Sequence, residues 1–337
     1  MSPHAGWYLV AFTDELVADL TPVRIGARRL MLVRGEGADP YLVDSTCPHR
    51  GADLAYGGVL RGDTVTCPFH GRRIRLGESS HPFAVRRHPT LTVGPLVFAR
   101  LADGPKGDCG FPDLVSGLLA GRTVVPAVAT DVQVPVHYVV ENAFDAEHFS
   151  VVHGVPAVQG MRARTHPAGY LTIAGEFMTV HDPWQDEALR DYLRFTLGPE
   201  CRRVAHTSSG FHATAFSPTL VVTVFGSGED AAVILTGAVP TPEGSRVRVA
   251  VAGGPGTATQ RVVEGAVKAI EQDVQVWSHL DPDAPTCLDE LDAPVIAFQD
   301  FCRRFPTAPH WTPIGVGGGE AARCAAELPA QVGSSAG

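Results

Sequence analysis

Cys47-Pro48-His49 and Cys67-Pro68-Phe69-His70 are the most informative segments in the N-terminal part of the chain. They form the pattern Cys-x-His-x17-Cys-x2-His, so each of two short loops brings one thiol and one imidazole. A glycine follows each group, at positions 51 and 71, where a tight loop needs a residue that tolerates positive φ. The two loops therefore offer a four-ligand set for a metal centre.

Two kinds of metal centre accept two cysteines and two histidines. In a [2Fe-2S] cluster of the Rieske type, the cysteines bind one iron and the histidines bind the other. A tetrahedral zinc ion is the alternative, but zinc modules usually present both cysteines first and both histidines later. Cysteine and histidine alternate along this chain, so the sequence predicts a Rieske cluster whose ligands are Cys47, His49, Cys67 and His70.

A second metal constellation lies in residues 141–153, Glu-Asn-Ala-Phe-Asp-Ala-Glu-His-Phe-Ser-Val-Val-His. Two histidines and one carboxylate form the facial triad of non-heme Fe(II) oxygenases, which leaves coordination positions open for O2 and substrate. His148 and His153 are five positions apart, which corresponds to about 140° around an ideal helix. Both rings therefore reach one iron only at a helix end or a distortion.

The carboxylate of such a triad has to come from elsewhere, and Asp273 is the best candidate. Apolar residues recur at three- and four-residue spacings through residues 257–280, which predicts a long amphipathic helix. Asp273 falls on the apolar stripe, where a carboxylate is costly unless it is paired or bound to a metal. An aspartate that is simply hydrogen-bonded is the alternative. The weaker candidates for the third ligand are Asp281, Asp283, Asp289 and Asp300.

In type and order, these motifs resemble the oxygenase component of the Rieske non-heme iron oxygenases over nearly the whole chain. In that family an N-terminal Rieske domain precedes a catalytic domain with an Asn-x2-Asp-x2-His-x4-His segment, matched here by Asn142, Asp145, His148 and His153. Residues 271–277, Glu-Gln-Asp-Val-Gln-Val-Trp, look like the bacterial 3-ketosteroid 9α-hydroxylase oxygenase branch, and vanillate O-demethylase-type enzymes share the histidine motif. Arg72 departs from the pattern, because the family usually has tryptophan there.

The resemblance implies a head-to-tail homotrimer in which the cluster of one subunit serves the iron of its neighbour. Asp145 then bridges the partner subunit's His70 and this subunit's His148 by hydrogen bonds; its simpler role is to orient His148. Asn142 is expected near the iron without binding it tightly, and helix capping is the alternative for this residue. Electrons from NAD(P)H are expected to reach the cluster through a separate reductase or ferredoxin.

Length and strand patterns predict an α+β chain of two domains. Residues 1–103 are predicted to form an all-β Rieske [2Fe-2S] domain, with strands at 8–12, 29–33 and 41–43. Residues 104–121 are rich in Gly, Pro and Asp and are expected to connect this domain to a catalytic mononuclear iron domain at 122–314. There the predicted antiparallel sheet, flanked by iron-binding helices, has strands at 220–225, 232–235 and 246–251, and a loose tail is expected at 315–337.

Charge and composition restrict the possible partners. The net charge of -9 argues against nucleic acid, because phosphate binding needs clustered Lys and Arg. The basic run Arg72-Arg73-Ile74-Arg75 is the local exception, and it is either a docking surface for an acidic ferredoxin or reductase or a solvated face. The sequence shows no signal peptide, no long apolar span and no disulfide framework among its seven cysteines, so a cytoplasmic protein without membrane contact is expected.

The two metal constellations together favour an enzyme. The resemblance implies a monooxygenase that uses O2 to hydroxylate a bulky apolar small molecule, such as a steroid or a polycyclic natural product. Oxidative O- or N-demethylation of a methylated aromatic compound is the close alternative. Two alternatives come from other functional classes: a Rieske electron carrier without catalysis, for which the second constellation would have no use, and a zinc-stabilised binding module.

Overall fold

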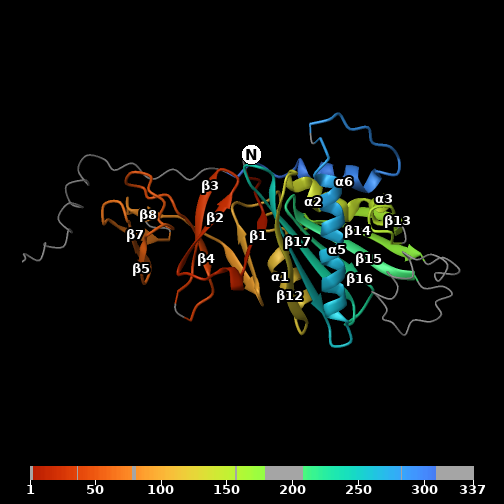
Figure 1. Ribbon diagram of the computed structural model, residues 1–337, viewed down its shortest axis with the longest axis horizontal. Coiled ribbons are helices and arrows are strands. Elements are labelled where there is room, and N and C mark those ends of the chain that lie inside the picture. The colour runs from red at the N-terminus through yellow and green to blue at the C-terminus, as the bar shows by residue number, and fades with distance from the viewer. Residues whose placement is uncertain are drawn as a thin grey trace, which may run out of the picture.

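The computed structural model describes residues 3–35, 37–77, 81–155, 158–178, 208–281 and 283–308. These residues form an elongated molecule, with β5 (Val59–Arg61) and β7 (Arg73–Leu76) at one end and α3 (Ala146–Val151) and β13 (Val158–Thr165) at the other (Figure 1). The predicted loose tail at 315–337 lies outside the described residues, as do Cys201 and Cys324. The predicted domain limits stay predictions.

Three small sheets make up the N-terminal part of the chain, and all strand pairs in them are antiparallel except β7 with β8. The strands predicted at 8–12, 29–33 and 41–43 are confirmed, since they fall within β1, β3 and β4. In sheet order the strands are β1 (Trp7–Phe12), β11 (Leu96–Arg100) and β10 (Thr90–Val93); β2 (Leu20–Ile25), β3 (Arg28–Val33), β4 (Tyr41–Asp44) and β9 (Arg87–His88); and β5 (Val59–Arg61), β6 (Thr64–Thr66), β7 (Arg73–Leu76) and β8 (Ala84–Val85).

A single seven-stranded antiparallel sheet forms the larger part of the molecule. The strands predicted at 220–225, 232–235 and 246–251 are confirmed within β16, β17 and β18, so the predicted α+β fold class holds. In sheet order the strands are β12 (Thr123–Val132), β18 (Ser245–Gly253), β17 (Ala232–Pro240), β16 (Leu220–Phe225), β15 (Ser208–Ser217), β14 (Leu171–Met178) and β13 (Val158–Thr165).

Different elements cover the two faces of this sheet. Side chains alternate along β18, so that Ala250 and Ala252 join one core cluster while Val249 and Val251 join another. Helix α1 (Phe111–Leu119) packs on the first face through Phe111, Val115 and Leu119. The long helix α5 (Thr259–Trp277) crosses the second face with α2 (Val136–Glu141) beside it (Figure 1). Helix α1 lies inside the segment that the sequence analysis treats only as a connection.

Strand β1 joins the small sheets to the large one, because it is buried on both faces. Trp7 and Leu9 pack in the core cluster of the large sheet, while Tyr8 and Val10 pack against the N-terminal strands. The two strands approach closely at Gly237 of β17, where an added Cβ would lie 2.6 Å from the Cβ of Leu9. The two parts of the chain therefore share core packing.

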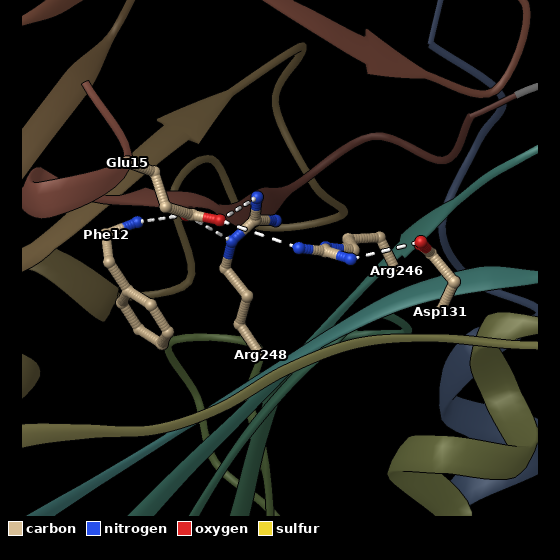
Figure 2. Close-up of polar contacts among 5 residues, drawn as sticks. All are labelled: Phe12, Glu15, Asp131, Arg246 and Arg248. Atoms are coloured by element: carbon tan, nitrogen blue, oxygen red, sulfur yellow. Dashed lines mark hydrogen bonds and ion pairs between the residues drawn. The ribbon is translucent and has the colours of Figure 1, made fainter. Parts of the chain in front are cut away.

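An ion-pair network adds a polar connection between the two parts (Figure 2). Glu15 lies in the short 3-10 helix η1 (Thr13–Glu15) after β1, and its carboxylate accepts hydrogen bonds from Arg248 Nε at 2.8 Å and from the Phe12 amide at 2.6 Å. Arg246 lies 3.8 Å from the same carboxylate and donates to Asp131 Oδ2 at 3.0 Å. Residues of β12 and β18 are thereby tied to the N-terminal part.

Glu15→Gln is expected to lower the free energy of unfolding by about 1 kcal/mol at neutral pH, because the charge paired with two arginines is lost. Burial alone would raise the pKa of Glu15, but hydrogen bonds from Arg248 and the Phe12 amide and the charges of Arg248 and Arg246 outweigh it, so the pKa is lowered. A lowered folded-state pKa gives stability that is present above the ordinary glutamate pKa of 4.5 and is lost as the pH falls through the folded-state value.

The measurement is urea unfolding of wild type and variant at neutral pH and at successively lower pH. The difference between the two proteins is expected to shrink below pH 4.5, the ordinary pKa of the group. Glu243→Gln, at an exposed position in the turn between β17 and β18, is the matched control and should stay within about 0.5 kcal/mol of wild type. Equal losses in the two variants would show that the network adds no stability.

Candidate metal centres

The two loops that carry the predicted cluster ligands have the same backbone arrangement. In the first loop the Gly51 amide donates to the Cys47 carbonyl at 2.8 Å, and the Cys47 amide donates to the Ala52 carbonyl at 2.7 Å. In the second loop Gly71 donates to Cys67 at 3.0 Å, and Cys67 donates to the Arg72 carbonyl at 2.8 Å. Both glycines have positive φ, 75° at Gly51 and 67° at Gly71, as the sequence predicts.

These loops bring the four predicted ligands together at one end of the molecule. Cys47 and Cys67 are each 2% exposed and belong to the same core cluster of the N-terminal part. The rings of His49 and His70 lie on the outer side, edge to face, with centroids 4.9 Å apart. His70 is exposed, as is its neighbour Phe69.

The arrangement of these side chains fits a Rieske cluster. Burial raises the pKa of the Cys47 thiol, the His49 amide hydrogen bond opposes this, and the adjacent Cys67 adds to the rise. Two thiols packed this closely become thiolates only when a metal compensates their charge. Buried cysteines and outer imidazoles place the cysteine side of a cluster in the core and the histidine side at the surface. Arg72, where the family usually has tryptophan, lies over the Phe83 ring at 4.7 Å.

The second predicted site begins at the short helix α3 (Ala146–Val151). Asp145 is its N-cap, and its Oδ1 accepts hydrogen bonds from the amides of Glu147 and His148, both at 3.0 Å. His148 lies within the helix, whereas His153 lies beyond its last residue. The two rings meet edge to face with centroids 4.5 Å apart. The helix end that the five-residue spacing required is therefore present.

Asp273 completes the group and comes from α5, more than 100 residues later in the sequence. It is buried at 5% exposure on the face of α5 that also buries Val262, Ala266 and Trp277. Its Oδ1 lies 3.1 Å from Nε2 of His148 and 3.5 Å from Nε2 of His153. The potential ligand atoms of these three residues all lie within 4.8 Å of one another. The structure thus brings together the three residues that the sequence analysis selected.

The geometry of this group fits a metal ion better than a hydrogen-bonded cluster. His148 Nε2 and Asp273 Oδ1 are both buried and have no hydrogen-bond partner among the described residues, although they lie 3.1 Å apart. Two ligand atoms at about 2.1 Å from one octahedral metal, at right angles to each other, are about 3 Å apart. Burial lowers the pKa of His153, the charge of Asp273 opposes this, and His148 lowers it further, so the neutral imidazole that binds metals is favoured.

The other predicted site residues lie outside the group. Asp281, Asp283 and Asp289 are exposed in the turn after α5. Asp300 is exposed on α6 (Ala293–Cys302) and pairs with Arg303. Asn142 begins the 3-10 helix η2 (Asn142–Phe144), and its Nδ2 is buried without a partner among the described residues. Its predicted place beside the iron stays a prediction.

One contact of this site was not predicted from the sequence. Gln272 Oε1 lies 3.1 Å from Nδ1 of His153, on the side of the ring away from Asp273. Its only sequence signal is its position immediately before Asp273, which is too weak to identify a partner 119 residues away.

An aromatic cluster adjoins the His-His-Asp group. The Phe149 ring lies 5.9 Å from the ring of His148 and 6.4 Å from that of His153, measured between centroids. It also meets the rings of Phe177 at 5.8 Å and Phe211 at 5.3 Å. Phe225 stacks on Phe177 with centroids 5.7 Å apart. The described surroundings of the group on this side are therefore apolar.

Known proteins are similar to this chain both in its N-terminal part and over most of its length. Residues 6–92 match the Rieske [2Fe-2S] domain. Aminopyrrolnitrin oxygenase PrnD of Pseudomonas fluorescens is 23% identical over 89% of this chain and 90% of its own length. The structure of NdmA from Pseudomonas putida CBB5 with caffeine has the same fold, with a TM-score of 0.62, 17% identity and coverage of 89% of this chain and 90% of that chain.

The chain thus combines a Rieske [2Fe-2S] domain with a His-His-Asp triad able to hold a mononuclear iron, and in this it is similar to the Rieske non-heme iron oxygenases. Cholesterol 7-desaturase nvd of Hemicentrotus pulcherrimus is 42% identical, but over 67 residues that span 20% of this chain and 14% of that protein. The cholesterol 7-desaturases of Bombyx mori and Ciona intestinalis are matched over 15% and 38% of their lengths. The narrower likeness to the ketosteroid hydroxylase branch stays a prediction.

Among the helices of the described residues, none has both the length and the hydrophobicity that crossing a bilayer requires.

Proposed function

We propose that this chain is the oxygenase component of a Rieske-type monooxygenase, which inserts one oxygen atom of O2 into a C–H bond of a bulky apolar substrate. The observation that carries the proposal is the buried group of His148, His153 and Asp273 in the same chain as a Rieske domain. An electron carrier needs the cluster but not a second set of metal ligands. The proposed cluster ligands are Cys47, His49, Cys67 and His70.

Each part of the site has a defined chemical task in this proposal. When bound, the cluster passes single electrons, and the mononuclear iron binds and activates O2. His148, His153 and Asp273 would hold that iron, and a set of only three protein ligands would leave room for O2 and substrate. Phe149 and the phenylalanines behind it exclude water from one side of the site. The protein's contribution is therefore to hold an open iron site next to an apolar surface.

We further propose that electrons pass between subunits of a head-to-tail homotrimer. The cluster loops lie beside β5–β8 at one end of the molecule, while α3 and α5 carry the triad in the other part (Figure 1). Electron tunnelling falls steeply with distance, so a neighbouring subunit is the better acceptor. Exposed His70 supports this route, because it places the histidine side of the cluster where a partner can contact it. A separate reductase or ferredoxin would supply the electrons, with exposed Arg73 and Arg75 on β7 as candidate contacts.

Asp145→Asn is expected to slow reoxidation of the reduced cluster by about 10- to 100-fold while leaving helix α3 and both metal centres intact. Asparagine caps helices about as well as aspartate, so the amide contacts to Glu147 and His148 should persist. Only the charge and acceptor strength of the proposed bridge are lost. The rate is followed by stopped-flow absorbance after mixing reduced protein and substrate with O2. If the cluster of Asp145→Asn is reoxidised at the wild-type rate, Asp145 only caps helix α3 and does not bridge the subunits.

Two outcomes of C–H oxygenation are supported by different observations. The apolar surroundings of Phe149 favour hydroxylation of a bulky apolar ring system. NdmA, which has the same fold, is bound to caffeine, a purine that carries N-methyl groups, and this favours oxidative demethylation. In demethylation the hydroxylated methyl carbon leaves as formaldehyde, so both outcomes begin with the same step. The steroid assignment and the demethylase assignment thus differ only in which carbon is oxidised.

The test is product mass under 18O2, with purified protein, a surrogate reductase and NADH, against steroids, methylated aromatics and N-methylpurines. A product that gains one labelled oxygen would support the hydroxylase. Loss of a methyl group with formaldehyde release would support the demethylase. Consumption of NADH without any labelled product or formaldehyde across the panel, in protein that retains its cluster, would favour an electron carrier.

A further inference from the structure

The two histidines of the triad are held in different ways. His148 lies inside α3, whose first turn is fixed by the side chain of Asp145, so the backbone of this histidine is restrained by the helix. His153 follows the end of α3 and lacks that restraint. Its ring is nevertheless largely enclosed, at 11% side-chain exposure, and turns Nε2 towards Asp273 at 3.5 Å. A ring outside the helix needs another contact to keep this orientation.

Gln272 supplies that contact from α5. Its Oε1 lies 3.1 Å from Nδ1 of His153, across 119 residues of sequence. An amide oxygen accepts and does not donate, so a hydrogen bond to Oε1 of Gln272 requires the proton of the neutral imidazole to be on Nδ1. The other ring nitrogen, Nε2, then carries the lone pair, and it faces the carboxylate of Asp273. The hydrogen bond therefore selects the tautomer as well as the orientation that metal binding through Nε2 requires.

The position of Gln272 in the chain strengthens this coupling. Gln272 and Asp273 are consecutive on α5, so one peptide unit carries both the triad carboxylate and the acceptor for the histidine. The side chains of consecutive helical residues point about 100° apart, which allows one to reach the metal position and the other to pass behind the ring. Helix α5 thus sets two of the three ligands relative to each other.

We propose that Gln272 is a positioning residue that fixes His153 in its Nδ1-protonated form for binding of the mononuclear metal through Nε2. This inference rests on the proposed triad, and it assigns a role to a residue outside the three ligands. Removing the acceptor would leave the ring free to rotate or to change tautomer. The expected consequence is weaker metal binding with the fold and the cluster unchanged.

The experiment is a titration of the full chain, with its cluster in place and its mononuclear metal removed, using Fe(II) under anaerobic conditions against a competing chelator. Gln272→Leu is expected to lower Fe(II) affinity by about 10- to 100-fold, the usual effect of losing a partner that orients a metal ligand. Gln272→Glu keeps an acceptor for Nδ1 and should retain affinity within about threefold of wild type. Gln275→Leu, at an exposed position on the same helix, is the matched control and should bind as wild type.

Wild-type Fe(II) affinity in Gln272→Leu would overturn the inference. If Gln272→Leu has a lower melting temperature than wild type, Gln272→Asn is used instead. Its side chain is one methylene shorter and does not reach Nδ1 of His153. Wild-type Fe(II) affinity in Gln272→Asn would also overturn the inference. The Fe(II) affinity of His148→Ala distinguishes failure of the inference about Gln272 from failure of the proposed triad. If His148→Ala binds Fe(II) normally, the proposed triad is wrong, whereas a loss in His148→Ala without one in Gln272→Leu contradicts only the role of Gln272.

Discussion

Replacing His148 by alanine is expected to remove the mononuclear iron and to lower substrate turnover by more than about 100-fold, since even residues that only orient a metal ligand cost 10- to 100-fold when lost. The physical reason is that the variant loses one of three proposed ligands, Nε2 of His148, which lies 3.1 Å from Asp273 Oδ1. Only the buried carboxylate and one imidazole remain to bind the metal. The proposed cluster ligands lie in loops of the N-terminal part, so the cluster should be unaffected. Its absorbance and the EPR signal of its reduced form should match those of wild type.

The measurement for His148→Ala is turnover with a surrogate reductase, together with iron content after gel filtration. His166→Ala is the control, because His166 is exposed in the turn after β13, where it caps no helix and lies outside the triad. It should keep its iron and its turnover. Unchanged iron and turnover in His148→Ala would show that the second site has no catalytic role.

The second large effect is expected for Cys67→Ser, which removes a thiolate from the proposed cluster. Serine is a poor ligand for iron-sulfur centres, so the cluster and its colour should be lost. The free energy of cluster binding is also folding free energy, and Cys67 is part of the core cluster that includes Cys47, Val65 and Ile74. We therefore expect a loss of several kcal/mol of stability, about 3 kcal/mol or more, in the N-terminal part.

Absorbance spectra and thermal unfolding of Cys67→Ser test this prediction. Cys287→Ser is the matched control, because Cys287 is exposed in the turn after α5 and has no role in either site. It should be coloured and as stable as wild type. A Cys67→Ser protein that retains its colour would exclude Cys67 as a ligand, and a colourless wild type rich in zinc would favour the tetrahedral zinc alternative.

The proposed metal ligands could be selected from the sequence because their signals are local. Alternating cysteine and histidine in two loops, glycines at 51 and 71, and the histidine pair in residues 141–153 can all be recognised from spacing alone. Selecting Asp273 required one more inference, that it lies on the apolar stripe of a helix. That helix is expected at 257–280 and is observed as α5 at Thr259–Trp277. A carboxylate on a buried face is unusual enough to point to a metal or another partner.

Features that depend on distant contacts were missed. The pairing of Glu15 with Arg248 joins residues 233 positions apart, and that of Gln272 with His153 joins residues 119 apart, so neither leaves a pattern in the sequence. Helix α1 was missed for a different reason. Its Gly-, Pro- and Asp-rich flanks suggested a connection, although Phe111, Val115 and Leu119 recur at the four-residue spacing of a buried helix face.

Whether one chain holds both a Rieske cluster and a separate iron can be measured directly by counting iron and acid-labile sulfide per chain in anaerobically purified protein. The expectation is about three irons and about two sulfides in wild type, falling to about two irons with unchanged sulfide in His148→Ala. About two irons in fully loaded wild type, with no further loss in His148→Ala, would contradict it and leave a cluster-bearing protein without an oxygenase site.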